Sequence, residues 1–189
     1  MAGHNTNEGV LFANPTVRTD AQLEAYLAFS YPGISSDIVT YVTQTLYPAI
    51  YDGSMPYTNG LERTFLIVTE SIFTCNTNLL ARAFGNKTYN YQFEVFPALH
   101  GFDIDYTFYN GQPTNVSTLP PLIAPLANVL QGYITNFAMT GNPNGKGLPA
   151  FPIYGKNGIE LGLNVSINSH MKDPTQNDRC MFWAKSLYN

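Results

Sequence analysis

Residues 89–101 read YNYQFEVFPALHG, and this stretch decides which fold the chain can adopt. Its first eight residues have the aromatic and β-branched composition of a strand, and Pro97 ends the run. A strand this apolar needs neighbouring strands on both sides and helices on both faces. His100 and Gly101 follow it, at the end of the strand where α/β folds place functional residues. The stretch therefore indicates a buried strand of a sheet, followed by a histidine that either belongs to a candidate site or is hydrogen-bonded to a backbone partner.

Helical periodicity surrounds the strand on both sides in the sequence. The spacing of apolar residues predicts helices over residues 19–30, 35–46, 61–84, 122–139 and 178–187. Residues 159–171 alternate well enough for a strand or short hairpin. The chain offers few other candidates to pair with residues 89–96, so these segments alone do not make a balanced α/β layer.

Composition excludes several classes of protein. The 189 residues are 44% hydrophobic and 12% charged, which fits one ordinary globular domain and neither a disordered chain nor a coiled coil. Nine Lys and Arg against 13 Asp and Glu give a net charge of −4, with no clustered basic patch, so we expect no nucleic-acid partner. No apolar run is long enough to cross a bilayer, so we expect no membrane span.

A second informative stretch is AGHNTNEGVLF, residues 2–12. Its glycines, Gly3 and Gly9, permit backbone angles that can hold the carboxylate of Glu8 at a fixed position. That carboxylate could orient a histidine, bind a cation, cap a helix or lie in a solvated turn. Because Glu8 precedes His100, the two stand in the chain order of acid and base in serine hydrolases of the α/β type.

The other polar candidates are weaker. His4, His100 and His170 lack the spacing of a metal site, so we expect no metal and no cofactor. Asp103 and Asp105 lie near His100 in the sequence and either compete for it or belong to a solvated turn. His170 is expected in a polar loop at the surface.

Several features are typical of an extracellular protein. Asn86, Asn115 and Asn164 each begin a glycan acceptor triplet. Cys75 and Cys180 form either a disulfide or two buried free thiols, and a bridge would stabilise the chain by roughly 4 to 5 kcal/mol in the chain-entropy model. The first residues, MAGHNTNEG, show no secretory signal, which suggests that a segment is missing upstream.

Four short segments resemble one family. Residues 3–9 match a Gly-x-Asn-x-x-Glu-Gly motif, and residues 100–104 resemble a His-Gly-x-Glu/Asp-Ile motif. Both motifs occur in type-B carboxylesterases, the family of cholinesterases and fungal extracellular lipases. Residues 71–84 and 179–183 resemble the fungal members. The resemblance covers essentially the whole chain, and the four segments occur in the family's order.

The resemblance implies a fold, an activity and site residues. The fold is α/β, the C-terminal portion of an α/β-hydrolase, with helices plus the last strands of the sheet. The activity is hydrolysis of a carboxylic ester, with Glu8 as the acid and His100 as the base of a catalytic triad. The low charge of the helices between them fits an ester with an apolar acyl chain. The helices between them would help to wall the substrate gorge. In the family such cysteines pair, which supports a Cys75–Cys180 disulfide.

The sequence departs from the family in one respect. It contains no Gly-x-Ser-x-Gly nucleophile motif and no Gly-Gly-Gly loop for an oxyanion hole. We therefore expect residues 1–189 to be a partial domain that is inactive alone and has the N-terminal half of the same enzyme as its partner. The full-length protein is expected to be secreted.

Two alternatives remain open. One is a non-catalytic, cholinesterase-like adhesion or binding domain, although such a domain has no need to retain both Glu8 and His100. The other is a truncated gene product without activity of its own, for which an exposed sheet edge and aggregation are expected.

Overall fold

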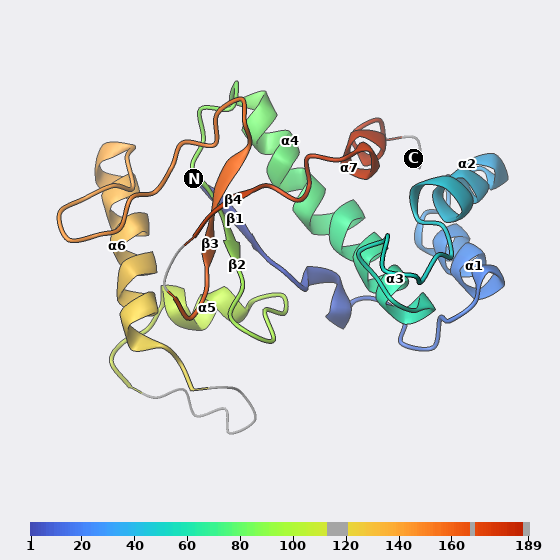
Figure 1. Cartoon of the computed structure of the whole chain (residues 1–189), viewed down its shortest axis with the longest axis horizontal. Helices are drawn as coiled ribbons and strands as arrows, with labels where there is room; N and C mark the ends of the chain where they lie inside the picture. The colour runs from blue at the N-terminus through green and yellow to red at the C-terminus, as the bar shows by residue number, and fades with distance from the viewer. Residues whose placement is uncertain (113–120, 167–168, 187–189) are drawn as a thin grey trace. The chain divides into compact units, whose positions relative to one another are not determined.

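The computed structural model describes residues 1–112, 121–166 and 169–186. The chain divides into two compact units, each with its own hydrophobic core. The sheet unit comprises Met1–Glu8 and Leu79–Pro174, and the helical unit comprises Gly9–Asn78 and Thr175–Asn189 (Figure 1).

The sheet unit is built on a four-stranded, mostly parallel sheet. The strands follow the order β1-β2-β3-β4, with parallel pairing in the first two pairs and an antiparallel β3–β4 pair. Their bounds are β1 Ala2–Asn5, β2 Asn90–Phe93, β3 Ile159–Leu163 and β4 Ser169–Lys172. Mostly parallel strands joined through helices confirm the predicted α/β class.

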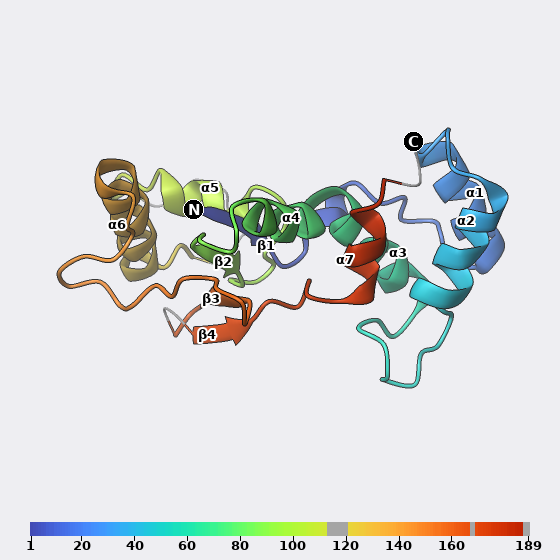
Figure 2. The same ribbon diagram turned by 90° about the horizontal axis from the view of Figure 1, so that it is seen from above.

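The two faces of this sheet differ in chemistry, because side chains alternate along each strand. One face carries Tyr91 and Phe93 of β2 with Leu161 and Leu163 of β3, all in the core of the sheet unit. Helix α6 (Ala124–Thr140) contributes Leu126, Ala127, Leu130 and Tyr133 to that core and runs beside the strands (Figures 1 and 2). The other face carries buried polar side chains: His4, Asn90, Gln92 and Glu160.

The helical unit is a cluster of short helices with defined starts. Its elements are η1 Glu8–Leu11, α1 Asp20–Ser30, α2 Ser36–Tyr41, η2 Val42–Leu46, α3 Gly60–Val68, η3 Thr69–Thr74 and α7 Asp178–Trp183. The chain runs from η3 directly into α4 (Cys75–Ala83). Thr19 closes a capping box on α1, and Ser35, Asn59 and Asn177 cap α2, α3 and α7 through their side-chain oxygens. Helices α1 and α2 lie side by side (Figure 2).

The core of the helical unit joins segments from both ends of the chain. Leu23, Leu27, Val42 and Ile67 are buried together with Phe182 and Trp183 of α7. Among the described residues, no helix is both long and apolar enough to span a bilayer.

The predicted helices are largely confirmed, and three local predictions need correction. Residues 2–12 form β1 and η1 rather than a turn alone. Asp103 and Asp105 lie on a short helix, α5 (Phe102–Thr107), rather than in a solvated turn. Residues 159–171 form two antiparallel strands, so His170 lies on β4 rather than in a loop, although it is exposed as predicted.

Candidate active site

Glu8 and His100 meet beyond the carboxyl ends of two neighbouring parallel strands, β1 and β2. An isolated bridge between Asn7 and Leu99 continues the parallel pairing past both strands. Glu8 is the next residue after Asn7, and His100 is the next residue after Leu99. The bridge therefore places Glu8 and His100 next to each other in the two loops. His100 Nδ1 lies 2.6 Å from Glu8 Oε2. The structure therefore joins the two predicted residues.

The surroundings of the two side chains differ. Glu8 is only 5% exposed, whereas the side chain of His100 is 46% exposed. A carboxylate can only accept hydrogen bonds, so Nδ1 is the ring nitrogen that carries the proton in this contact. The proton exchange that chemistry requires then falls to Nε2. A buried carboxylate behind a half-exposed imidazole is the arrangement of an orienting acid and a general base.

The second oxygen of Glu8 is held by Asn5, at the end of β1. The backbone N–H of Asn5 donates to Glu8 Oε1 at 2.6 Å, and its Nδ2 lies 3.3 Å from the same oxygen. Hydrogen bonds to an ionised acceptor are among the stronger ones in proteins. Both oxygens of the buried carboxylate are therefore engaged, one by Asn5 and one by His100.

Asp103 lies on the far side of Asn5. Its Oδ1 accepts a hydrogen bond from Asn5 Nδ2 at 3.1 Å, and its Oδ2 accepts one from the hydroxyl of Tyr91 at 3.0 Å. The interpretation of Asp103 as part of a solvated turn is therefore wrong, since it is half-buried on α5. Asp105 on the same helix is exposed. No sequence spacing signals the Asp103 contacts, because Asn5 is 98 residues away.

Two glycines of the 3–9 motif fill positions where a side chain does not fit. A Cβ on Gly3 would stand 2.2 Å from the ring of Tyr91, so this glycine lets the tyrosine cross β1. A Cβ on Gly9 would stand 2.4 Å from the backbone nitrogen of Thr69, and the Gly9 N–H donates to Thr69 Oγ1 at 2.9 Å. The glycines flanking Glu8 are thus required by close packing of side chain and backbone.

Gly101 serves the site through its backbone angle. It has φ of +82° and is the N-cap of α5, a left-handed conformation that favours glycine. The chain turns there from the loop of His100 into the helix that carries Asp103. This is the physical reason for a glycine directly after the histidine.

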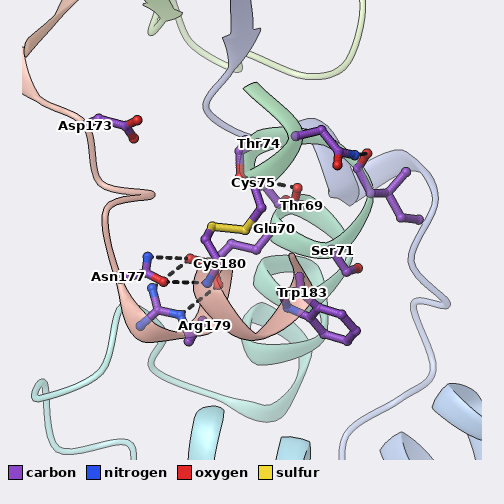
Figure 3. Close-up of a disulfide and its surroundings, with 12 residues drawn as sticks. Thr69, Glu70, Ser71, Thr74, Cys75, Asp173, Asn177, Arg179, Cys180 and Trp183 are labelled. Carbon is purple, nitrogen blue, oxygen red and sulfur yellow. Dashed lines mark hydrogen bonds and ion pairs between the residues drawn. A yellow bond between two sulfur atoms is a disulfide. The ribbon is translucent and has the colours of Figure 1, made fainter. Parts of the chain in front are cut away.

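Cys75 and Cys180 are joined in a disulfide between the start of α4 and helix α7, as the resemblance implied (Figure 3). The bridge spans 105 residues of sequence. Both cysteines are buried in the core of the helical unit.

A buried polar cluster beside this disulfide was not visible in the sequence. Arg179 donates to both oxygens of Glu70, from Nε to Oε2 and from an amino group to Oε1, each at 2.7 Å (Figure 3). Tyr47 donates to Glu70 Oε2 at 2.6 Å, and Trp183 Nε1 donates to the Tyr47 hydroxyl at 2.8 Å. Burial and the charge of Glu70 raise the pKa of Tyr47 well above its ordinary value, so the phenol remains a donor.

The remaining predicted residues lie apart from the Glu8–His100 pair. Asn86 and Asn164 are half-buried, and Asn164 Nδ2 donates to Glu94 Oε2 at 2.9 Å, whereas Asn115 lies outside the described residues. His4 is buried on the polar face of the sheet, where burial lowers its pKa. Among the residues that the structure describes, no group of three histidine, cysteine, aspartate or glutamate side chains is arranged to hold a metal ion.

The fold of this chain occurs in solved esterases. The structure matches EstA of Aspergillus niger with a TM-score of 0.78, at 23% identity, over 97% of this chain and 38% of that one. It matches a PNB esterase with a TM-score of 0.65, at 22% identity, over 94% of this chain and 36% of that one. The sheet and its helices are therefore part of an α/β-hydrolase fold.

The family follows from the sequence comparisons. The model of the carboxylesterase family matches residues 1–183. Carboxylesterase patB of Penicillium expansum is 35% identical over 187 residues, which cover 98% of this chain and 32% of that protein. A secreted lipase of Arthroderma benhamiae is 29% identical over 147 residues, 76% of this chain and 26% of that protein. The chain belongs to the carboxylesterase family, and it spans about a third of the length of the patB relatives that it matches.

Proposed function

We propose that this chain supplies the acid and the base of a serine carboxylic-ester hydrolase, with Glu8 as the acid and His100 as the base. The observation that carries the proposal is the 2.6 Å contact between His100 Nδ1 and the buried Glu8 carboxylate in a member of the carboxylesterase family. The nucleophilic serine comes from polypeptide outside these 189 residues, whose sequence has no Gly-x-Ser-x-Gly motif.

The reaction follows from this pair. Nε2 of His100 accepts the hydroxyl proton of the serine as its oxygen attacks the ester carbonyl, and a tetrahedral intermediate forms. The resulting imidazolium is stabilised by the negative charge of Glu8 and then returns the proton to the leaving alkoxide. The alcohol leaves, and the acyl group stays bound to the serine as an acyl-enzyme. Water then attacks the acyl-enzyme with His100 again as the base, the acid is released, and His100 ends neutral. General-base assistance of this kind is typically worth about 10² to 10⁴ in rate.

The substrate that we propose is an ester with an apolar acyl chain. The chain is only 12% charged, and large apolar side chains such as Phe96 and Phe108 are exposed in the sheet unit.

We further propose that the whole protein works in an oxidising, extracellular environment and carries glycans. Support for this comes from the disulfide, the acceptor triplets and a relative described as a secreted lipase.

The test is a chimera in which this chain replaces the aligned segment of the Penicillium expansum relative. We expect the chimera to hydrolyse p-nitrophenyl butyrate and to react with a fluorophosphonate probe at a serine outside these residues. His100→Ala should lower kcat by about 10⁴- to 10⁶-fold, on the scale of triad losses in serine hydrolases. His170→Ala is the matched control, since His170 is exposed on β4 and its Nε2 lies 3.0 Å from the Ala150 carbonyl.

Two results would contradict the proposal. One is an active chimera whose kcat is unchanged by His100→Ala. The other is a fluorophosphonate adduct on a serine of the isolated 189-residue chain that disappears in the same variant, because the nucleophile would then lie within these residues.

A further inference from the structure

The side chain of Asn5 has an unusual set of contacts. Its single amide nitrogen faces two carboxylates, Glu8 Oε1 at 3.3 Å and Asp103 Oδ1 at 3.1 Å. Its carbonyl oxygen is buried and has no hydrogen-bond partner among the described residues. An unpartnered buried acceptor costs free energy. In this orientation the amide nitrogen has two carboxylate acceptors, which offset that cost.

The opposite orientation of the amide is unfavourable while both carboxylates are present. A flip of 180° would place the carbonyl oxygen between Glu8 and Asp103, three acceptors with no hydrogen between them. With Asp103 removed, only Glu8 would oppose that flip, and the flipped oxygen would still repel Glu8 Oε1. Asp103 is therefore the second of two acceptors that fix the amide of Asn5, so that a donor faces the oxygen of Glu8 that does not contact His100.

Asp103 is itself held in place by Tyr91 of β2. The Tyr91 hydroxyl donates to Asp103 Oδ2 at 3.0 Å, and the ring of Tyr91 passes over the backbone of Gly3. Burial raises the pKa of Tyr91, as do the charge of Asp103 and the hydrogen bond to it, so the phenol keeps its proton. Tyr91 is thus a permanent donor to Asp103. It lies on β2, the strand that leads to the loop of His100.

We propose that Asp103 is a positioning residue, which fixes the side chain of Asn5 and through it the direction in which Glu8 faces His100. The inference rests on the proposed function. Asp103 contacts Asn5 and Tyr91, so its influence on His100 passes through Asn5 and Glu8. The backbone N–H of Asn5, at 2.6 Å from Glu8, remains when Asp103 is removed. Loss of Asp103 should therefore cost much less than loss of Glu8.

The experiment reads the contact between Glu8 and His100 directly. In the 189-residue chain with ¹⁵N-labelled histidine, the Nδ1 proton of His100 is observed by NMR, where a short charge-assisted hydrogen bond gives a strongly downfield, slowly exchanging signal. We expect Glu8→Gln to abolish this signal. Asp103→Ala should move it upfield and speed its exchange at least tenfold. Asp103→Asn, which retains an oxygen for one of the two contacts, should fall between Asp103→Ala and the unsubstituted chain.

Asp105→Asn is the matched control, because Asp105 is an exposed acid on the same helix and should leave the signal unchanged. In the chimera, Asp103→Ala should lower kcat about 10- to 100-fold with KM within twofold. In a Glu8→Gln background it should have no further effect, since it acts through Glu8. A residue with only a structural role would lower the melting temperature without moving the signal or the ratio of kcat to KM.

The two proposals fail in different ways. A His100 signal that survives Glu8→Gln would overturn the acid–base pair and with it the proposed function. A signal that is lost in Glu8→Gln but keeps its position and exchange rate in both Asp103 variants would overturn the positioning role alone. Asp103→Asn preserves the size of the side chain, so it decides the matter if Asp103→Ala does not fold.

Discussion

Two buried glutamates, Glu8 in the sheet unit and Glu70 in the helical unit, are held by different kinds of partner. Glu70 is 4% exposed and accepts from Arg179 through both oxygens and from the Tyr47 hydroxyl. Glu8 is 5% exposed and accepts from Asn5 and from a half-exposed histidine. Arginine keeps its charge at every pH at which proteins fold, whereas histidine gains and loses a proton near neutrality.

The difference separates a structural ion pair from a candidate catalytic pair. Around Glu70 every partner is a permanent donor, so the charge is fixed and the cluster can only hold the helices and the disulfide in place. Around Glu8 the backbone and Asn5 hold one oxygen, and the other faces a group that can change its charge. Burial of a carboxylate is therefore uninformative by itself, and the partner determines which role the geometry supports.

Removal of Glu70 should have the largest effect on stability. Glu70→Ala leaves the half-buried guanidinium of Arg179 without its carboxylate, and we expect a loss of about 3 kcal/mol, the lower end of the range for breaking a fully buried pair. Trp183 is the chain's one tryptophan and donates to Tyr47 in this cluster, so urea unfolding followed by its fluorescence measures the loss. Asp37→Ala, at an exposed acid of the same unit, is the control and should change the free energy of unfolding by less than about 1 kcal/mol. An equal loss in both variants would mean that the Glu70 cluster is not a buried ion pair in solution.

Glu160 supplies a third case, a buried acid on the polar face of the sheet. It is fully buried on β3, and among the described residues neither carboxyl oxygen has a hydrogen-bond partner. Burial, together with the charges of Asp173 and Glu94, raises its pKa from 4.5 to about 9. The folded chain therefore keeps this proton at neutral pH, while the unfolded chain releases it.

The sign of the pH dependence follows from the raised pKa. Stability from this group is fully present below pH 4.5 and falls by up to about 1.4 kcal/mol per pH unit as the pH rises toward 9, where the folded carboxyl also ionises. Glu160→Gln removes the ionisation, so it should remove this decline and raise the free energy of unfolding at pH 7 by on the order of 3 kcal/mol. Urea melts at pH 5 and pH 8 measure it, with Asp105→Asn as the control. A decline that is as steep in Glu160→Gln as in the original chain would show that Glu160 is not the buried neutral acid.

The two residues of the candidate site could be predicted from the sequence, whereas the strand β1 beside them could not. Glu8 and His100 are predicted because each precedes a glycine in a short motif that resembles one family, and because their order in the chain is that of an acid and a base. β1 was missed because four residues, one of them Gly3, carry too little period to distinguish a strand from a turn. Its identity depends on pairing with β2, which is a long-range contact.

The helices were predicted from local signals that the structure retains. Thr19, Ser35 and Asn177 begin helices because their side chains accept from backbone N–H groups nearby in the sequence. The contacts of Asp103 with Asn5 and of Glu70 with Arg179 carry no such signal, since these partners are about 100 residues away. Local hydrogen bonding can therefore be read from sequence, whereas the networks that fix the two buried glutamates require the fold.

A smaller change sharpens the comparison between the two glutamates by altering geometry without charge. Arg179→Lys keeps a cation beside Glu70 but replaces the two-pronged contact by a single ammonium, so one carboxylate oxygen loses its ionic donor. We expect a loss of about 1 to 2 kcal/mol in urea unfolding followed by Trp183 fluorescence, well below that of Glu70→Ala. The control is Lys185→Arg, at an exposed cation near the same helix, which should be close to neutral. A loss as large as that of Glu70→Ala would mean that the fork geometry, rather than the presence of a countercharge, holds Glu70. The Arg179–Glu70 pair would then differ from the Glu8–His100 pair in the geometry of its two contacts as well as in its fixed charge.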